Sequence, residues 1–260
     1  MSLQFFSERS LQLTVTLIFI FGLMIGSFLN VVIYRLPQQE SIVFPSSHCP
    51  DCGTELQMID LIPVISFLLN KGHCRYCESR ISYQYPLVEL LTALIFILLY
   101  HQYYLTIQFV IYALLAAALI AVSIIDLQHL IIPNQITYPG IIIAFLLSLI
   151  NPEIAYINSL LGIVVPALFL FLIAVLSRGG LGMGDVKLIA VIGGFIGVQE
   201  AFCVIFLGSI IGAIVGIYLI LFSTKGWKSK LPFGVFLSLS GLLMILWGQE
   251  IINFYWQLIL

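Results

Sequence analysis

The sequence predicts an all-α polytopic membrane protein with about eight transmembrane helices and a cytosolic zinc-binding loop. Three observations lead to this fold class. The 260 residues are 61% hydrophobic and only 8% charged, whereas soluble domains carry about 25% charged residues. The apolar residues gather in long runs, and one polar segment holds four of the five cysteines. The apolar composition predicts that the protein lies in a lipid bilayer. The net charge of −2 gives no indication of a nucleic-acid partner.

The apolar runs define the expected helices, since about 20 apolar residues cross the hydrocarbon core of a membrane. Residues 11–34 form the first run, which looks like a signal peptide but lacks a small-residue cleavage site, so we expect it to be retained. The other runs lie at 86–100, 105–125, 136–150, 154–176, 201–222 and 232–258, with a short run at 188–198.

The positions of the ten basic residues predict the orientation. With eight helices and both ends outside, nine basic residues fall on one side of the membrane and Arg9 alone on the other. Lys and Arg are in excess on the cytosolic side of membrane proteins. We therefore expect three parts: a first transmembrane helix at 1–34, a cytosolic tetracysteine loop at 35–85, and a helical membrane domain at 86–260.

The tetracysteine loop has the spacing of a metal site. Two C-x2-C pairs, Cys49 with Cys52 and Cys74 with Cys77, are separated by 21 residues. Four thiolates arranged as a tetrahedron are a preferred environment of Zn²⁺. Two disulfides are the alternative, but the reducing cytosol disfavours them. Because protein atoms would occupy all four positions, we expect the zinc to stabilise the loop rather than to catalyse.

Two aspartates lie at helix ends that should share one membrane depth. Asp126 ends an apolar run in "SIIDLQHL", and Asp185 precedes one in "GGLGMGDVKL". Carboxylates in membrane helices are costly and are usually functional. Two close carboxylates resist being ionised together, so one serves as a general base toward water while the other protonates the carbonyl oxygen under attack. The pair is thus a candidate for aspartic-protease chemistry.

Gly182 and Gly184 remove side chains next to Asp185, which would let a peptide backbone approach closely. In the alternative interpretation, both aspartates only cap helix ends at the interface and the glycines form an ordinary loop. Glu89, in "YPLVELLTALIF", is a third acid at a helix end. It could bond to Tyr83 or Tyr85, pair with Arg35 or Arg80, or assist the aspartates.

Six ordered motifs, which span nearly the whole chain, resemble the type IV prepilin leader peptidases. These are membrane aspartic proteases that process pilins and pilin-like subunits of secretion or DNA-uptake machines. The resemblance rests on "GSFLNVVIYRLP", the two C-x2-C pairs, "ISYQYPLVELLTALIF", "IDLQHLIIPN", "GGLGMGDVKL" and "LPFGVFLSLSG". One short motif would carry little weight, but six in the family's order are specific.

The resemblance implies a reaction and a set of residues. The substrate would be a prepilin or pseudopilin with a short basic leader in the cytosol and an apolar stem in the membrane. The leader would be cleaved at the cytosolic face of a bacterial cytoplasmic (inner) membrane. The residues implied are the catalytic pair Asp126 and Asp185, with Gly182, Gly184, Lys187 and Glu89 in support.

The resemblance also implies a second activity. Many members of the family methylate the new amino terminus with S-adenosylmethionine as the methyl donor. This step has been associated with the tetracysteine loop, in which Gly72 of "KGHCRYC" matches a glycine of interest. His73 stands where Lys or Arg is common in the family, and "PFGVF" replaces the more usual "PFGPF". Neither departure touches the aspartates.

Two other classes of protein are compatible with parts of the pattern. A proton-coupled transporter also places acids beside glycine-broken helices, but its acids lie near the midplane of the membrane and its halves are repeats. The acids here lie at one face, and the sequence shows no repeat. A non-catalytic assembly factor would dock a cytosolic partner through the zinc loop and would tolerate the loss of both aspartates.

Overall fold

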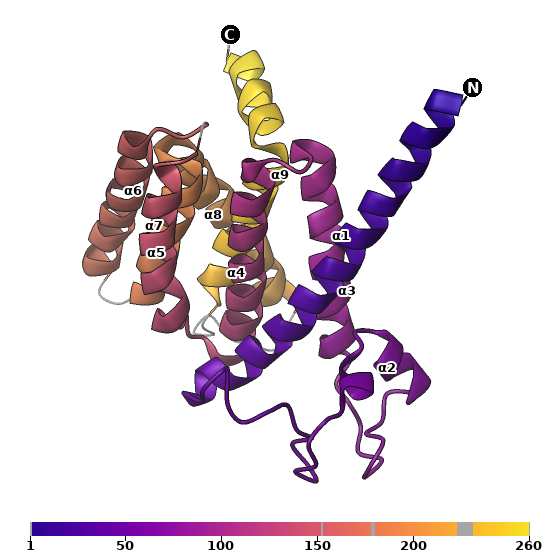
Figure 1. The fold of residues 1–260 in the computed structure, drawn as a ribbon. Helices are drawn as coiled ribbons and strands as arrows, with labels where there is room; N and C mark the ends of the chain where they lie inside the picture. The colour runs from indigo at the N-terminus through magenta and orange to yellow at the C-terminus, as the bar shows by residue number, and fades with distance from the viewer. Residues whose placement is uncertain (1, 152, 178–179, 223–230, 260) are drawn as a thin grey trace. The chain divides into compact units, whose positions relative to one another are not determined.

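The computed structural model describes residues 2–151, 153–177, 180–222 and 231–259. Within these ranges the chain is helical, and only two isolated β-bridges accompany the helices. The all-α fold class is therefore confirmed. The helices are α1 (Ser2–Arg35), η1 (Leu36–Gln38), η2 (Met58–Leu61), α2 (Ile65–Leu69), α3 (Gln84–Tyr103), α4 (Ile107–His129), α5 (Asn134–Ser148), α6 (Tyr156–Leu176), α7 (Met183–Ile196), α8 (Val198–Phe222) and α9 (Phe233–Ile259), drawn in Figure 1.

Each of the eight apolar runs forms a helix, but the helices differ in length. Six of the described helices, α1, α3, α4, α6, α8 and α9, are long and apolar enough to cross a membrane. The other two, α5 and α7, have 15 and 14 residues, or about 21–23 Å at 1.5 Å per residue. They are shorter than the hydrocarbon core, which is about 30 Å thick. The chain is thus a multi-pass membrane protein with two short apolar helices.

The orientation stays a prediction. Four of the nine basic residues on which it rests, Arg178, Lys225, Lys228 and Lys230, lie outside the described residues.

The chain divides into two compact units, which are described separately. Unit 1 comprises Met1–Phe109 and unit 2 comprises Val110–Leu260. Unit 1 contains α1, the tetracysteine loop and α3, while unit 2 contains most of α4 and all of α5 to α9. The three parts expected from the sequence, with boundaries at residues 34 and 85, were defined by their expected roles and not by compact packing. This division also stays a prediction.

In unit 1, two glycines let α1 pack closely along α3. A Cβ atom added to Gly22 would lie 2.5 Å from the Cα atom of Ala93, and one added to Gly26 would lie 2.6 Å from that of Glu89. Spaced four residues apart, the two glycines form one smooth face. Small residues at this spacing allow membrane helices to approach through their backbones. Asn30, one turn further on, donates a hydrogen bond to the carbonyl oxygen of Tyr85.

In unit 2, α7 is the central helix. All residues from Asp185 to Ile196 except Lys187 are buried, and the helix packs against α5, α6, α8 and α9. The contact with α6 is a backbone contact, because a Cβ atom on either Gly162 or Gly193 would overlap the carbonyl oxygen of the other glycine. Ser159 of α6 also donates a hydrogen bond of 2.8 Å to the carbonyl oxygen of Gly194. These contacts hold the helix that begins next to Asp185.

Candidate functional site

Asp126 and Asp185 lie together in unit 2, although 59 positions separate them in the sequence. Asp126 is on the last turn of α4 and Asp185 is the third residue of α7. Both are buried, with 5% and 8% of their surface exposed, and the two carboxylates interact electrostatically. The folded chain therefore brings the predicted pair into one place.

The first turn of α7 holds the Asp185 carboxylate in position. The N–H of Gly182 at the N-cap donates a 3.2 Å hydrogen bond to Oδ2 of Asp185, and the N–H of Asp185 donates to the carbonyl oxygen of Gly182. The first of these bonds is one half of a capping box, in which the side chain of the third helical residue accepts from the N–H of the N-cap. The second is a backbone turn bond, since glycine has no side chain to make the other half. A Cβ atom on Gly182 would lie 3.1 Å from the same Oδ2 atom, so glycine leaves one side of the carboxylate open.

The start of α9 forms another side of the site. The backbone N–H groups of Gly234 and Val235 approach the carboxylate of Asp126. A Cβ atom on Gly234 would lie 2.8 Å from Oδ2 of Asp126. That oxygen is buried and has no hydrogen-bond partner among the described residues. An oxygen so placed is available to bond with water or with a substrate.

Ile132, in the connection between α4 and α5, packs against both glycine segments. Its Cβ atom lies 3.0 Å from the position of a Cβ atom on Gly184, and its Cδ1 atom lies 2.8 Å from that of one on Gly234. The glycines thus accommodate the isoleucine as well as the carboxylates. Four segments converge here: the end of α4, the α4–α5 connection, and the starts of α7 and α9.

Lys187 connects the start of α7 to α5. Its ammonium group donates a hydrogen bond to Oδ1 of Asn134, the last residue of the "IDLQHLIIPN" motif, and lies 5.3 Å from the centre of the Tyr138 ring. A cation over an aromatic face is attracted by the ring. Lys187 therefore fixes the helix that carries Asp185, and it makes these contacts on α5 rather than with either aspartate.

The four cysteines of the loop gather in unit 1 as a candidate metal site. The Sγ atoms of Cys49, Cys52, Cys74 and Cys77 all lie within 4.8 Å of one another, and the thiols are free rather than paired in disulfides. The Sγ atoms of Cys49 and Cys77 are 3.8 Å apart. A tetrahedral zinc with Zn–S bonds of about 2.3 Å spaces its sulfurs by about the same distance.

The two C-x2-C segments have the same backbone arrangement. Cys49 and Cys74 each donate an N–H to the residue five positions on, and each accepts one from the residue four positions on. That last residue has a positive φ in both segments, 70° at Gly53 and 60° at Glu78. Burial raises the pKa of the Cys49 thiol, but hydrogen bonds from the backbone at Cys52 and Asp51 outweigh it and bring the pKa to about 6. The fold thus favours the thiolate, which is the form that binds metal.

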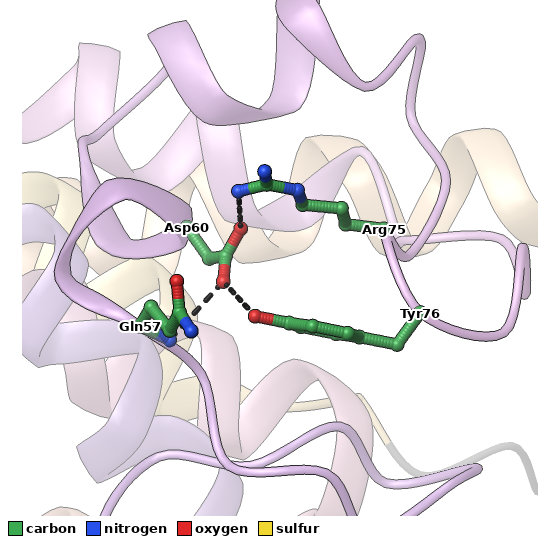
Figure 2. A network of polar contacts seen from close by, with 4 residues as sticks. All are labelled: Gln57, Asp60, Arg75 and Tyr76. Carbon is green, nitrogen blue, oxygen red and sulfur yellow. Dashed lines mark hydrogen bonds and ion pairs between the residues drawn. The ribbon is translucent and has the colours of Figure 1, made fainter.

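A polar network connects the second C-x2-C segment to η2 (Figure 2). Oδ2 of Asp60 accepts hydrogen bonds from the N–H of Gln57 at 3.1 Å and from the hydroxyl of Tyr76 at 2.9 Å. Oδ1 of Asp60 lies 3.8 Å from the Arg75 guanidinium. Arg75 and Tyr76 are the two residues between Cys74 and Cys77, so the network holds the second pair of sulfurs against the rest of the loop.

Glu89 braces the loop. It is buried in α3, and its Oε2 atom accepts a 2.7 Å hydrogen bond from the N–H of Val64, the N-cap of α2. Of the partners expected from the sequence, no hydrogen bond or ion pair with Tyr83, Tyr85, Arg35 or Arg80 is found in the described part of the chain. Arg35 instead donates to the carbonyl oxygens of Ser41 and Ser46. Glu89 and Arg35 thus both bond to the backbone of the loop.

Gly72 has a local reason to be glycine. Its φ is +73°, a conformation that other residues rarely adopt, and a Cβ atom there would lie 3.1 Å from Cζ of Phe67. The turn that follows α2 therefore favours glycine at this position. A role of Gly72 in methyl transfer stays a prediction.

The predicted site residues do not include Ile132 and Gly234, which the structure places in the site. Both lie inside motifs of the sequence, "IDLQHLIIPN" and "LPFGVFLSLSG". The glycine in "PFGVF" is the indication that could have located the third side of the site, because it stands at a helix start where a close approach is allowed. Its neighbour Asp126 is more than 100 positions away in the sequence, so the contact itself was not predictable.

The architecture and the two clusters define a class of protein: a multi-pass helical membrane protein with a buried carboxylate pair in one unit and a four-cysteine candidate metal site in the other. Two family models match this chain. The bacterial peptidase A24 N-terminal domain matches residues 20–103, and the type IV leader peptidase family matches residues 112–217.

Curated relatives cover nearly the whole chain. A protein of Bacillus subtilis named prepilin leader peptidase/N-methyltransferase is 36% identical over 92% of this chain and 97% of its own length. A protein of the same name from Aeromonas salmonicida is 34% identical over 94% of this chain and 94% of its own length. Another, from Pseudomonas aeruginosa, is 31% identical over 91% of this chain and 91% of its own length. No solved structure matches the chain significantly. The chain belongs to the type IV leader peptidase family.

Proposed function

We propose that this protein is a prepilin leader peptidase in which Asp126 and Asp185 form the catalytic pair. The observation that carries the proposal is the convergence of two buried carboxylates from different helices beside Gly182 and Gly234, which have no side chains. Membership of the type IV leader peptidase family and the names of the relatives support the same conclusion.

The proposed reaction is direct attack of water on the peptide bond after the leader. One carboxylate, ionised, takes a proton from the water, and the other, protonated, gives its proton to the carbonyl oxygen of the scissile bond. When the tetrahedral intermediate collapses, the C–N bond breaks and the carboxyl group that took the proton from water gives it to the leaving nitrogen, which becomes the new amino terminus. The other carboxylate recovers its proton from the hydroxyl oxygen, the leader is released with a free carboxyl group, and no acyl-enzyme forms. The Oδ2 atom of Asp126, which has no hydrogen-bond partner among the described residues, is suited to such an exchange.

The proposed substrate is a prepilin or pseudopilin with a basic leader and an apolar stem. Both carboxylates lie at helix ends, so the scissile bond would sit at the membrane surface while the stem stays in the membrane. The predicted orientation places that surface in the cytosol of a bacterium, at its inner membrane.

The relatives' names include N-methyltransferase, and we propose the same second activity here. It would use S-adenosylmethionine to methylate the amino terminus that cleavage exposes. Gly72 stays the candidate residue for this step, on the resemblance to the family alone, because its positive φ explains the glycine without testing a role in methyl transfer.

The experiment that tests the proposal uses the full-length protein in liposomes with a purified prepilin. Mass spectrometry of the product, with and without S-adenosylmethionine, reports both activities. We expect loss of the leader in either case and a further gain of about 14 Da, one added CH2 group, with the methyl donor. An intact prepilin after incubation would refute the peptidase, and a product without the added mass would refute the methyltransferase alone.

Gly234→Ala should lower the rate of cleavage by about a hundredfold. The added methyl group would lie 2.8 Å from Oδ2 of Asp126 and from Cδ1 of Ile132, so the carboxylate must shift, and a misplacement of about 1 Å costs about that factor. Gly248→Ala on the same helix is the matched control, because its methyl group would meet only the flexible end of Met244, at 3.2 Å. Equal rates for the two variants would contradict the role given to Gly234.

The candidate metal is Zn²⁺, held by Cys49, Cys52, Cys74 and Cys77, and we expect about one zinc per chain by elemental analysis. Replacing all four by serine should remove the zinc and make the loop sensitive to protease. Cleavage should fall less than it does on loss of an aspartate, since the carboxylate pair lies in the other unit. Cys203→Ser, which removes the lone cysteine of α8, is the control and should keep the zinc. Full zinc content in the four-serine variant would refute the site.

A further inference from the structure

An apolar groove of about 590 Å³ lies in unit 2 between α6 and α8. Its walls include Phe169 and Ile173 of α6, Phe202 and Phe206 of α8, Leu181 just before α7, and Phe233, the first residue of α9. Its volume is in the range of sites that bind ligands. Four of the nine lining residues are phenylalanines, and the rings of Phe169 and Phe202 meet edge to face with their centres 5.6 Å apart.

The groove begins where the carboxylate pair lies. Leu181 directly precedes Gly182, whose N–H donates to Asp185. Phe233 directly precedes Gly234, which packs against Asp126. Both backbone segments that touch the carboxylates therefore also form the groove.

Each wall of the groove is attached to a different half of the site. The α6 wall packs on α7, which carries Asp185, through the backbone contact between Gly162 and Gly193. The α8 wall packs on α9, since Cβ atoms on Gly208 and Gly212 would lie 3.3 and 3.0 Å from atoms of Phe236, in the first turn of α9. A segment bound in the groove would thus contact α6, which packs on the helix that carries Asp185, and α8, which packs on the helix whose first turn contacts Asp126.

The groove also extends away from the carboxylates into the membrane. Along α6 it reaches Phe169, seven residues before the helix ends at Leu176, which corresponds to about 10 Å. A chain that leaves the carboxylate pair along the groove therefore enters the apolar depth of a transmembrane helix.

We propose that this groove binds the apolar stem of the substrate over the residues that directly follow the scissile bond. The inference rests on the proposed peptidase function. An apolar stem matches the chemistry of the lining, and the groove leads to it from the point of cleavage. Phe206 remains 62% exposed, so its ring is free to pack against such a stem. An acyl chain of a lipid would match the same lining, and the experiment separates these two occupants.

The test introduces a photoreactive benzoylphenylalanine at Phe206 or, as the matched control, at Ile214. Both residues lie on α8 and both are 62% exposed, but Ile214 is not part of the groove. The full-length variants in liposomes are irradiated with prepilin, and the adducts are identified by mass spectrometry. We expect an adduct with the pilin stem at position 206 and only lipid adducts at position 214.

Three results would overturn the inference. Pilin adducts at both positions in equal yield would mean that contact with α8 is not specific. Lipid adducts alone at position 206, with cleavage by the unsubstituted protein intact, would show that lipid fills the groove while the proposed function stands. Absence of cleavage by the unsubstituted protein would refute the proposed function, and with it the stem as the occupant.

Kinetics provide an independent readout. Phe206→Ala should raise KM for a full-length prepilin roughly tenfold and leave kcat unchanged, because the ring contacts a part of the substrate that does not react. Ile214→Ala should change neither constant. A fall in kcat at unchanged KM would contradict a role in binding the stem.

Discussion

Asp126→Asn and Asp185→Asn should each reduce cleavage of a prepilin by at least about a thousandfold. Asparagine has nearly the shape of aspartate but neither accepts nor donates a proton in the reaction, and general acid–base catalysis contributes about 10²–10⁴-fold in rate. Both carboxylates are buried in the same unit. The reaction needs one acid and one base, so the carboxylate that remains cannot fill both roles at once. The measurement is the rate of leader release by each purified, full-length variant in liposomes.

The control is Glu200→Gln, which changes an acid in the first turn of α8 in the same unit and should keep the wild-type rate. Circular dichroism and thermal unfolding in detergent establish that each asparagine variant is folded. Cleavage by a folded Asp126→Asn or Asp185→Asn protein at the wild-type rate would show that the aspartates are structural. The non-catalytic docking role of the tetracysteine loop would then become the leading hypothesis.

The eight apolar helices and the cysteine cluster could be predicted because each depends on a local pattern, although only six of these helices are long enough to cross a membrane. Apolar runs of sufficient length indicate helices in a membrane, and the two C-x2-C pairs carry their own metal-ligand spacing. The cysteines do gather, with sulfurs within 4.8 Å of one another. The aspartates were paired by an argument about membrane depth, and they do lie in one unit and interact.

The partners of buried polar residues could not be predicted, because they are backbone groups whose positions depend on tertiary structure. Glu89 accepts from the N–H of Val64, and Arg35 donates to two carbonyl oxygens of the loop. A sequence displays side-chain charges but not which backbone groups lack a partner, so it favours ion pairs where the fold uses main-chain bonds. For the same reason, the contact of the Gly234 backbone with Asp126 could not be predicted from the sequence.

The second large effect is expected from Gly193→Ala. A Cβ atom at this position would overlap the carbonyl oxygen of Gly162 on α6, so the two helices must separate and the hydrogen bond from Ser159 to the carbonyl oxygen of Gly194 must lengthen or break. We expect a loss of about 3 kcal/mol in the free energy of unfolding, at the upper end for overpacking of a core. Because α7 carries Asp185, cleavage should fall as well.

Gly216→Ala on α8 provides a control with the opposite expected sign. Among the described residues, its methyl group would meet only Cδ1 of Leu231, at 3.2 Å, and alanine favours a helix over glycine by up to about 1 kcal/mol. Thermal unfolding in one detergent should therefore rank Gly216→Ala at or above the wild type and Gly193→Ala well below it. If both variants unfolded at the wild-type temperature, α6 and α7 would not be in backbone contact. The position of Asp185 would then depend on the capping bonds at Gly182 and on Lys187 rather than on the packing of α7.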